Sequence, residues 1–273
     1  MAVEIRAPMF IIGAPRSGTS ILYEKLAQHP DVTYISKATK KAPGSLLLTR
    51  FLMHFRKSMQ PTEARAVWNR FWRGREDATL GREDAHPRAR RYLRRVVRNH
   101  IALFQKPRFL AKYLGNSFRI EFLDAIFPDA IFIHIIRDGR AVAYSVKRSM
   151  LKEGGVYWGA RPPGWRELRD MPLLDAAALQ WKLTVEYTCE SAQALPEERY
   201  IELRYEDFAA RPAEALSEVA GKCGLTWDRP DLGSLVSDIE NRNYKWREAL
   251  KPDEVERLHS LIGDLLVRLG YES

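Results

Sequence analysis

The chain has 273 residues, 45% of them hydrophobic and 29% charged, and this composition excludes a wholly disordered protein. Lysine and arginine outnumber aspartate and glutamate by 44 to 35, and the net charge of +9 favours anionic ligands such as nucleotides, nucleic acid, acidic glycans or lipid headgroups. The two cysteines lack the spacing of a disulfide framework or a zinc site. The sequence shows neither a signal peptide nor the ~20 apolar residues of a membrane span, so we expect one cytoplasmic domain.

The first predicted strand covers residues 9–12, a continuous apolar run that ends at a glycine. A helix should begin near Thr19, because apolar residues recur at helical spacing until His29 and Pro30 stop the pattern. A strand, a glycine-containing loop and a helix are therefore contiguous.

Residues 43–105 are predicted to form a helical insertion, with helices over 46–55, 62–72 and 87–104. The last helix is amphipathic and carries a basic stripe opposite its apolar one. The stripe consists of Arg88, Arg90, Arg91, Arg94, Arg95 and Arg98. Such a stripe would suit a nucleic-acid or anionic-membrane binding module, but a solvated helix face or the rim of an acceptor site is the commoner explanation. Aromatic signatures of RNA binding are missing, so we expect no nucleic-acid partner and leave peripheral membrane contact open.

The remaining elements alternate between strand and helix. Strands are predicted over 109–111, 130–136 and 200–203, and helices over 118–127, 141–150, 172–195, 212–223 and 253–269. This alternation indicates an α/β fold with a central parallel sheet and helices on both faces. We find no internal repeat and no linker, so the single domain is expected to span 1–273.

The loop between the first strand and helix has the features of an anion-binding site. It reads Gly13-Ala14-Pro15-Arg16-Ser17-Gly18-Thr19-Ser20. Backbone N–H groups and the helix dipole favour a negative charge at such a turn, and Arg16 and the hydroxyls add donors for a tetrahedral anion. A glycine turn that only permits tight packing is the simpler alternative.

A nucleoside-triphosphate kinase is a second alternative, because its phosphate loop has the same strand–loop–helix setting. Thr19 and Ser20 follow Gly18 directly, however, where such a loop would supply a lysine. No convincing apolar strand ends in an aspartate that would hold magnesium. A donor with one 5′-phosphate and a sulfuryl group needs neither feature.

The loop and the following His29-Pro30-Asp31 resemble the sulfotransferase family that uses 3′-phosphoadenosine 5′-phosphosulfate (PAPS), nearest to its bacterial, carbohydrate and tyrosyl-protein branches. The resemblance implies a P-loop-like three-layer sandwich. It also implies that the loop binds the 5′-phosphosulfate through residues Pro15, Arg16, Ser17, Gly18, Thr19 and Ser20. Transfer of the sulfuryl group to a small-molecule, glycan, lipid or peptide acceptor would follow, with no metal. Neither the acceptor nor the oligomeric state can be read from the sequence.

A second motif follows the strand predicted over 130–136. Arg137 stands at the strand's carboxyl end and Ser145 lies about two helical turns later, so both could face one ligand. The pair resembles the family's 3′-phosphate site, although an Arg-Asp-Gly sequence by itself is often a surface turn.

Two later segments extend the resemblance. Tyr205 stands where the family places a tyrosine beside the nucleotide, and Lys245 and Trp246 stand in a basic-aromatic segment that closes over the donor in related enzymes. Each has a simpler alternative, since Tyr205 could pack at a strand end and Trp246 could lie in the core beside a solvated turn.

The catalytic groups are less clearly marked. Lys112, just after a short strand, resembles a lysine near the transferred group, and with Arg16 it would stabilise developing charge. Several relatives carry a catalytic glutamate shortly after the first helix, but residues 34–40 contain no carboxylate here. The next candidates for the general base are Glu83, Asp84 and His86, although they could equally belong to a solvated charge cluster.

Overall fold

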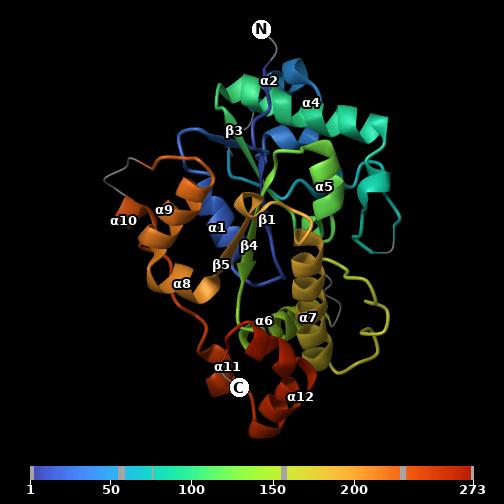
Figure 1. Cartoon of the computed structure of the whole chain (residues 1–273), viewed down its shortest axis with the longest axis vertical. Coiled ribbons are helices and arrows are strands. Elements are labelled where there is room, and N and C mark those ends of the chain that lie inside the picture. The colour runs from blue at the N-terminus through green and yellow to red at the C-terminus, as the bar shows by residue number, and fades with distance from the viewer. Residues whose placement is uncertain (1–2, 55–58, 76, 155–158, 228–231, 272–273) are drawn as a thin grey trace.

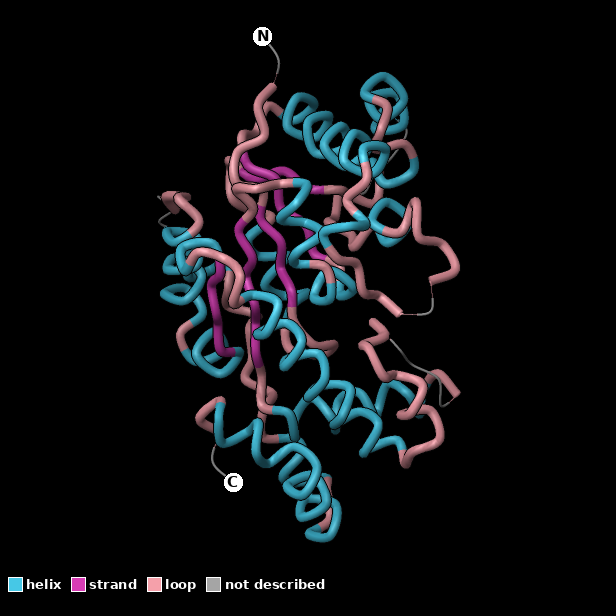
Figure 2. The backbone as a smooth tube through the Cα atoms, turned by 45° about the vertical axis from the view of Figure 1, so that its right-hand side comes forward, coloured by secondary structure: helices cyan, strands magenta, loops and turns pink. Residues whose placement is uncertain are grey.

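A computed structural model of the chain describes residues 3–54, 59–75, 77–154, 159–227 and 232–271. Its centre is a five-stranded parallel sheet in the order β2-β3-β1-β4-β5 (Figures 1 and 2). The strands are β1 (Met9–Ile12), β2 (Val32–Tyr34), β3 (Arg108–Lys112), β4 (Ile131–Ile136) and β5 (Tyr200–Arg204). The register pairs Phe10 with Ala111 on one side and with Phe132 on the other, so β1 is central and fully buried.

Helices connect the strands and surround the sheet. They are α1 (Thr19–Leu26), α2 (Leu46–His54), α3 (Arg65–Trp68), α4 (Pro87–Phe104), α5 (Ile120–Ile126), α6 (Gly139–Lys152), α7 (Leu173–Ala192), α8 (Tyr205–Ala210), α9 (Pro212–Lys222), α10 (Leu232–Leu235), α11 (Lys245–Ala249) and α12 (Pro252–Arg268). Short 3-10 helices cover Thr39–Lys41, Arg82–Asp84, Leu114–Phe118 and Glu197–Arg199. No helix of the described residues is long and apolar enough to cross a membrane.

Alternating side chains of the strands supply two separate cores. Phe10 and Ile12 pack with residues of α4 and α5 on one face, and Met9 and Ile11 pack with residues of α1 and α9 on the other. A third core joins α6, α7, α11 and α12, which lie together at one end of the molecule (Figure 1). The predicted three-layer α/β architecture is therefore confirmed.

Two local predictions differ from the structure. Strand β2 was not expected, because its three residues are too few to show an apolar period. The helix expected over 62–72 shrinks to α3, because Ala64 takes a left-handed backbone conformation with φ of 47° immediately before it.

The basic stripe of α4 is partly used within the fold. Arg90 and Arg94 donate hydrogen bonds to the carbonyl oxygens of Ala125 and Ile126 at the end of α5, the latter over 2.9 Å. Arg98 donates to the carbonyl of Val3 at 3.2 Å. These three arginines donate to backbone carbonyl groups, two of them at the carboxyl end of α5, which is a structural use of the stripe.

Candidate functional site

A cavity of about 480 Å³ opens at the carboxyl ends of the central strands. Parallel sheets collect ligands at this edge, particularly where the strand order reverses, as it does here around β1. The cavity is lined by Arg16, Gly18, Thr19, Ser20, Ile21, Glu63, Lys112, Leu114, Arg137, Tyr205, Asp238, Glu240 and Arg242. Segments far apart in the sequence therefore meet at one site.

The loop after β1 needs glycine at two positions. Gly13 has φ of 144°, and a Cβ atom there would lie 2.5 Å from the carbonyl oxygen of Ile135. Gly18 has φ of 98° and caps α1, and a Cβ atom there would lie 2.7 Å from the ring of Tyr205. The glycines thus let the backbone turn closely against β4 and Tyr205 while the first residues of α1 face the cavity.

Arg16 and Arg137 join this loop to the second predicted motif. The Nε of Arg16 donates to the Oγ of Ser145 over 3.1 Å, and Arg137 donates to the carbonyl oxygen of Arg16 over 3.0 Å. Arg137 is 8% exposed, and burial lowers the pKa of its guanidinium below the usual value. The structure therefore links Arg16 to both Ser145 and Arg137, although Ser145 is not among the described lining of the cavity, and a shared ligand of Arg137 and Ser145 stays a prediction.

Tyr205 closes another wall of the cavity. Its ring lies under the guanidinium of Arg137, 4.3 Å from the ring centroid, and its hydroxyl donates to the carbonyl of Glu240 over 3.2 Å. Arg137 also donates to Asn243 and to the carbonyl of Arg242, each over 3.0 Å. The segment 240–243 is thereby held against the strand ends.

Lys112 lies at the end of β3 with its ammonium inside the cavity. Its Nζ donates to the Oγ of Ser20 over 3.1 Å and forms an ion pair with Glu63. Lys112 is 5% exposed, whereas the side chain of Glu63 is 39% exposed. A carboxylate thus stands beside the loop 13–20, within reach of both protein donors and solvent.

Sequence reasoning missed Glu63 because it looked for the carboxylate along residues 34–40. In the structure that stretch pairs with residues 60–62: the amide of Lys37 donates to Gln60, the amide of Thr62 donates to Ile35, and Ser36 forms an antiparallel bridge with Pro61. Glu63 follows directly. No motif marks it, and only the pairing of these segments brings it to the cavity.

The three residues that the sequence suggested as general base, Glu83, Asp84 and His86, lie outside the described lining of this cavity. Asp84 accepts hydrogen bonds from Arg75 over 2.9 Å and from the amide of Gly81 over 3.0 Å. His86 caps α4, where its Nδ1 accepts from the amide of Ala89. Glu83 and Asp84 line a separate hollow. Because none of the three is among the described residues that line the cavity, we do not assign the general base to them.

Lys245 and Trp246 are also absent from the described lining of the cavity. Trp246 is 5% exposed and packs in the core of α6, α7 and α12, with the guanidinium of Arg140 4.7 Å from its ring centroid. Lys245 begins α11. The structure thus favours the simpler alternative for Trp246, and donor binding by Lys245 stays a prediction.

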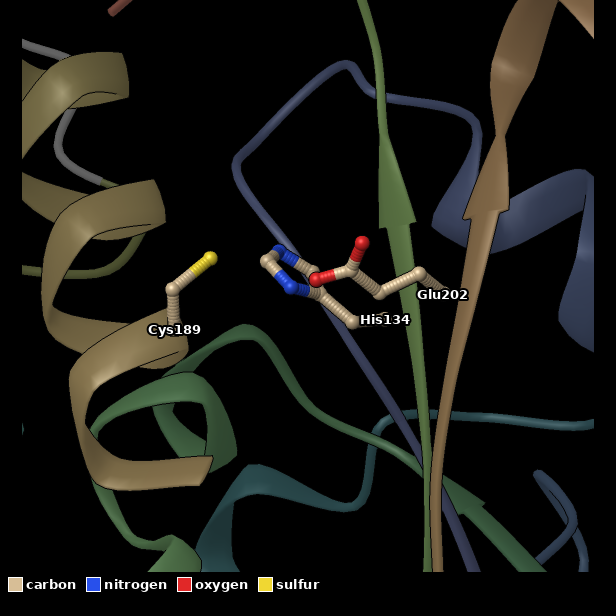
Figure 3. Close-up of side chains that lie close together, drawn as sticks. All are labelled: His134, Cys189 and Glu202. Carbon is tan, nitrogen blue, oxygen red and sulfur yellow. The ribbon is translucent and has the colours of Figure 1, made fainter. Parts of the chain in front are cut away.

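A potential metal-ligand group lies apart from this lining, on β4, β5 and α7. Figure 3 shows the thiol of Cys189 turned towards the imidazole of His134 and the carboxylate of Glu202, with one ligand atom of each within 4.8 Å of the others. The hydroxyl of Tyr200 lies 2.6 Å from Nδ1 of His134. Burial raises the pKa of the Cys189 thiol, which opposes the thiolate that binds metals. We assign these residues a packing role, and the prediction of metal-free chemistry remains a prediction.

The residues of the cavity fit a phosphosulfate group. Ser17 belongs to the same loop but not to the described lining, and its Oγ is buried without a hydrogen-bond partner among the described residues. Gly18 leaves space that a Cβ atom could not share with Tyr205. Arg16, Lys112 and Arg137 supply positive charge around the amino terminus of α1.

Comparison with known proteins agrees with this geometry. The profile of the Sulfotransferase family matches residues 8–229. The chain belongs to the sulfotransferase family. The nodulation protein NoeE of Sinorhizobium fredii is 25% identical over 96% of this chain, which spans 65% of the length of NoeE. The ω-hydroxy-β-dihydromenaquinone-9 sulfotransferase Stf3 of Mycobacterium bovis is 26% identical over 97% of this chain and 75% of its own length.

Solved structures of sulfotransferases share the fold. STF9 from Mycobacterium avium superposes with a TM-score of 0.63 at 18% identity, over 98% of this chain and 78% of its own. A mouse sulfotransferase complexed with PAP, the desulfated form of PAPS, superposes with a TM-score of 0.50 at 12% identity, over 95% of this chain and 84% of its own. The predicted family and fold are thus confirmed, and this sulfotransferase is an enzyme.

Proposed function

We propose that this sulfotransferase transfers the sulfuryl group of PAPS to an acceptor hydroxyl, or less readily to an amine, at the cavity around the loop 13–20. The observation that carries the proposal is the convergence of Arg16, Lys112 and Arg137 on the amino terminus of α1. Neutralising a nucleotide that bears a 3′-phosphate and a 5′-phosphosulfate requires such a cluster. The PAP-bound mouse sulfotransferase supports the choice of nucleotide.

We propose two phosphate subsites, which the contacts support. The loop 15–20 and the first turn of α1 would bind the 5′-phosphosulfate through amides and hydroxyls, with Ser17 Oγ as a donor that has no protein partner among the described residues. Arg137 and Ser145 would bind the 3′-phosphate beside Tyr205. On binding, Arg16 would exchange its contact with Ser145 for ligand oxygens.

Lys112 and Glu63 would carry the chemistry. The S–O bond to the 5′-phosphate breaks, a new S–O bond to the acceptor oxygen forms, and the proton of the acceptor hydroxyl must be removed. Lys112, already donating to Ser20, is placed to donate to the oxygens that gain charge. Glu63 is placed to take the proton and, being partly exposed, to release it to water.

Calorimetry with PAP tests the donor assignment directly. We expect binding that does not require magnesium, and an affinity loss of about tenfold or more for Arg16→Met, because one charge-assisted contact contributes about 1.5–3 kcal/mol. Arg95→Met on the exposed part of α4 is a matched control and should bind PAP normally. If the wild-type protein bound magnesium-ATP but not PAP, the proposal would fail and a kinase would replace it.

The proposed acceptor group is a hydroxyl. Stf3 is named for ω-hydroxy-β-dihydromenaquinone-9, a hydroxyl-bearing compound, which supports a hydroxyl acceptor. A carbohydrate, a lipid, a peptide or a small metabolite can each supply such a hydroxyl group.

We also propose a cytoplasmic location, which the free thiols of Cys189 and Cys223 support.

A further inference from the structure

A second cavity, of about 450 Å³, lies next to the donor cavity and is lined by arginines. It contains Arg65, Arg73, Arg75, Arg119 and Arg161, and Asp77 is the acidic residue among its described lining. We call it the arginine cavity. Trp72 and Tyr113 add aromatic walls. This volume suits a small ligand better than a long polymer segment.

The two cavities are separated by short stretches of chain. Lys112 and Leu114 line the donor cavity, while Tyr113 between them lines the arginine cavity. Glu63 lines the donor cavity, while Arg65 lines the arginine cavity. A ligand in the arginine cavity would therefore lie beside the two residues assigned to proton removal and charge stabilisation.

Ala64 produces this division between Glu63 and Arg65. It is 7% exposed and has φ of 47°, a left-handed conformation that costs a non-glycine residue about 1 kcal/mol. Backbone strain of this kind often persists at ligand sites. Here the left-handed residue Ala64 stands between Glu63, which lines the donor cavity, and Arg65, which lines the arginine cavity.

The positive charge of the arginine cavity is incompletely neutralised by the protein. Arg75 pairs with Asp84 over 2.9 Å, and Arg119 is buried, donating to the carbonyls of Ala78 and Trp68 and to Asn69. Within the part of the chain that the structure describes, no ion pair involves Arg65 or Arg73, and both are exposed.

Arg119 lies close to other charged groups of this cavity. Burial is the main reason that the pKa of Arg119 falls to about 10; Tyr113 and Asp84 raise it, whereas the like charges of Arg75 and Arg65 lower it. An anion entering the cavity would relieve this repulsion. Asp77, whose carboxylate accepts from the amide of Thr79, offsets part of this charge, but five arginines share the same lining.

We propose that the arginine cavity binds the acceptor, and that the acceptor is a small hydroxyl-bearing molecule with a carboxylate, sulfate or phosphate group. The anionic group would contact Arg65 and Arg73, with a hydroxyl directed past Tyr113 to Glu63. The inference rests on the proposed function for its chemistry. The anion-binding part stands on the arginine cavity alone.

A matched pair of probes tests the charge requirement. We would titrate 4-nitrophenyl β-D-glucuronide and 4-nitrophenyl β-D-glucoside, which differ only at C6 (a carboxylate in the first, a hydroxymethyl group in the second), into the protein with and without saturating PAP. The glucuronide should bind about tenfold more tightly at low salt, and the difference should shrink as salt screens the charges. The double variant Arg65→Ser/Arg73→Ser should lose that preference, bind the glucoside as before and keep its affinity for PAP.

The outcomes separate the two proposals. If the protein does not bind PAP but prefers the glucuronide, and this preference depends on Arg65 and Arg73, the donor assignment is rejected and the anion site is kept. Three results would overturn the proposal of an anionic acceptor. Both probes could bind equally, the glucuronide could fail to bind at millimolar concentration, or its preference could survive in the double variant. Binding of an acidic tyrosine peptide but not of the glucuronide would also overturn it, because the occupant would then be a peptide.

Discussion

The carboxylate beside Lys112 comes from Glu63 and not from residues 34–40. The stretch 34–40, which carries no carboxylate, is paired with residues 60–62, and the hydroxyl of Tyr23 on α1 donates to the carbonyl of Thr62 over 3.4 Å. These contacts fix the segment that presents Glu63 to Lys112. The position of the carboxylate therefore depends on two loops and a helix.

Replacing Glu63 by glutamine tests its assignment as the general base. Removing a general base typically lowers kcat by about 10²–10⁴-fold, and we expect a loss in that range with little change in the affinity for PAP. Glu63→Asp should recover part of the activity. The measurement is initial-rate kinetics with PAPS together with PAP calorimetry.

Glu83→Gln is the matched control, because Glu83 lines a separate hollow. We expect its kcat and PAP affinity to equal those of the wild type. A large loss of kcat in Glu83→Gln with normal rates in Glu63→Gln would return the base to the residues first suggested by the sequence.

At the scale of elements, the basic stripe of α4 illustrates how a surface pattern can have a structural use. Arg94 donates to the carbonyl of Ile126 and lies 5.9 Å from the ring centroid of Phe127, whereas Arg95 one residue later is exposed. The two arginines are neighbours with the same charge. Only the packing of α4 on α5 distinguishes them.

Thermal unfolding of Arg94→Met and Arg95→Met tests this use. Loss of one hydrogen bond of about 1 kcal/mol should lower the Tm of Arg94→Met by about 2–4 °C, and Arg95→Met should unfold like the wild type. Retention of DNA or anionic liposomes should be unchanged in both. Binding that both variants lose, with no effect on Tm, would favour a polyanion-binding stripe instead.

At the scale of the whole molecule, two buried histidines predict acid sensitivity. Burial lowers the pKa of His100 to about 4 and that of His134 to about 3, below the usual value near 6.5. His100 lies between the carbonyl of Val96 at 2.8 Å and the hydroxyl of Thr39 at 3.0 Å, an arrangement that fits its neutral form.

The sign of the pH dependence follows from these shifts. The unfolded chain takes up protons below pH 6.5 while the folded chain does not, so the stabilisation is complete above that pH. It is lost as pH falls towards about 4, by up to about 1.4 kcal/mol per pH unit for each histidine. Urea unfolding at pH 7, 6 and 5 should show the decline, and His100→Gln should reduce its slope. A slope unchanged by that substitution would contradict the role of His100.

The sequence by itself determined the fold class and the family. Apolar runs ending at glycine or arginine mark β1 and β4, and the loop 13–20 and the Arg137 motif each lie within one strand–loop–helix unit, so both could be located from local pattern. The roles of Arg16, Arg137 and Ser145 in donor binding stay predictions.

Only the tertiary structure decided where Glu63, Arg65 and Trp246 lie. Glu63 and Arg65 were expected within one regular helix, but Ala64 breaks it and separates them between two cavities. For Trp246 the sequence left donor binding and a core position open, and the structure places it in the core. Contacts between distant segments determine these positions, and no periodicity along the chain encodes which segments will meet.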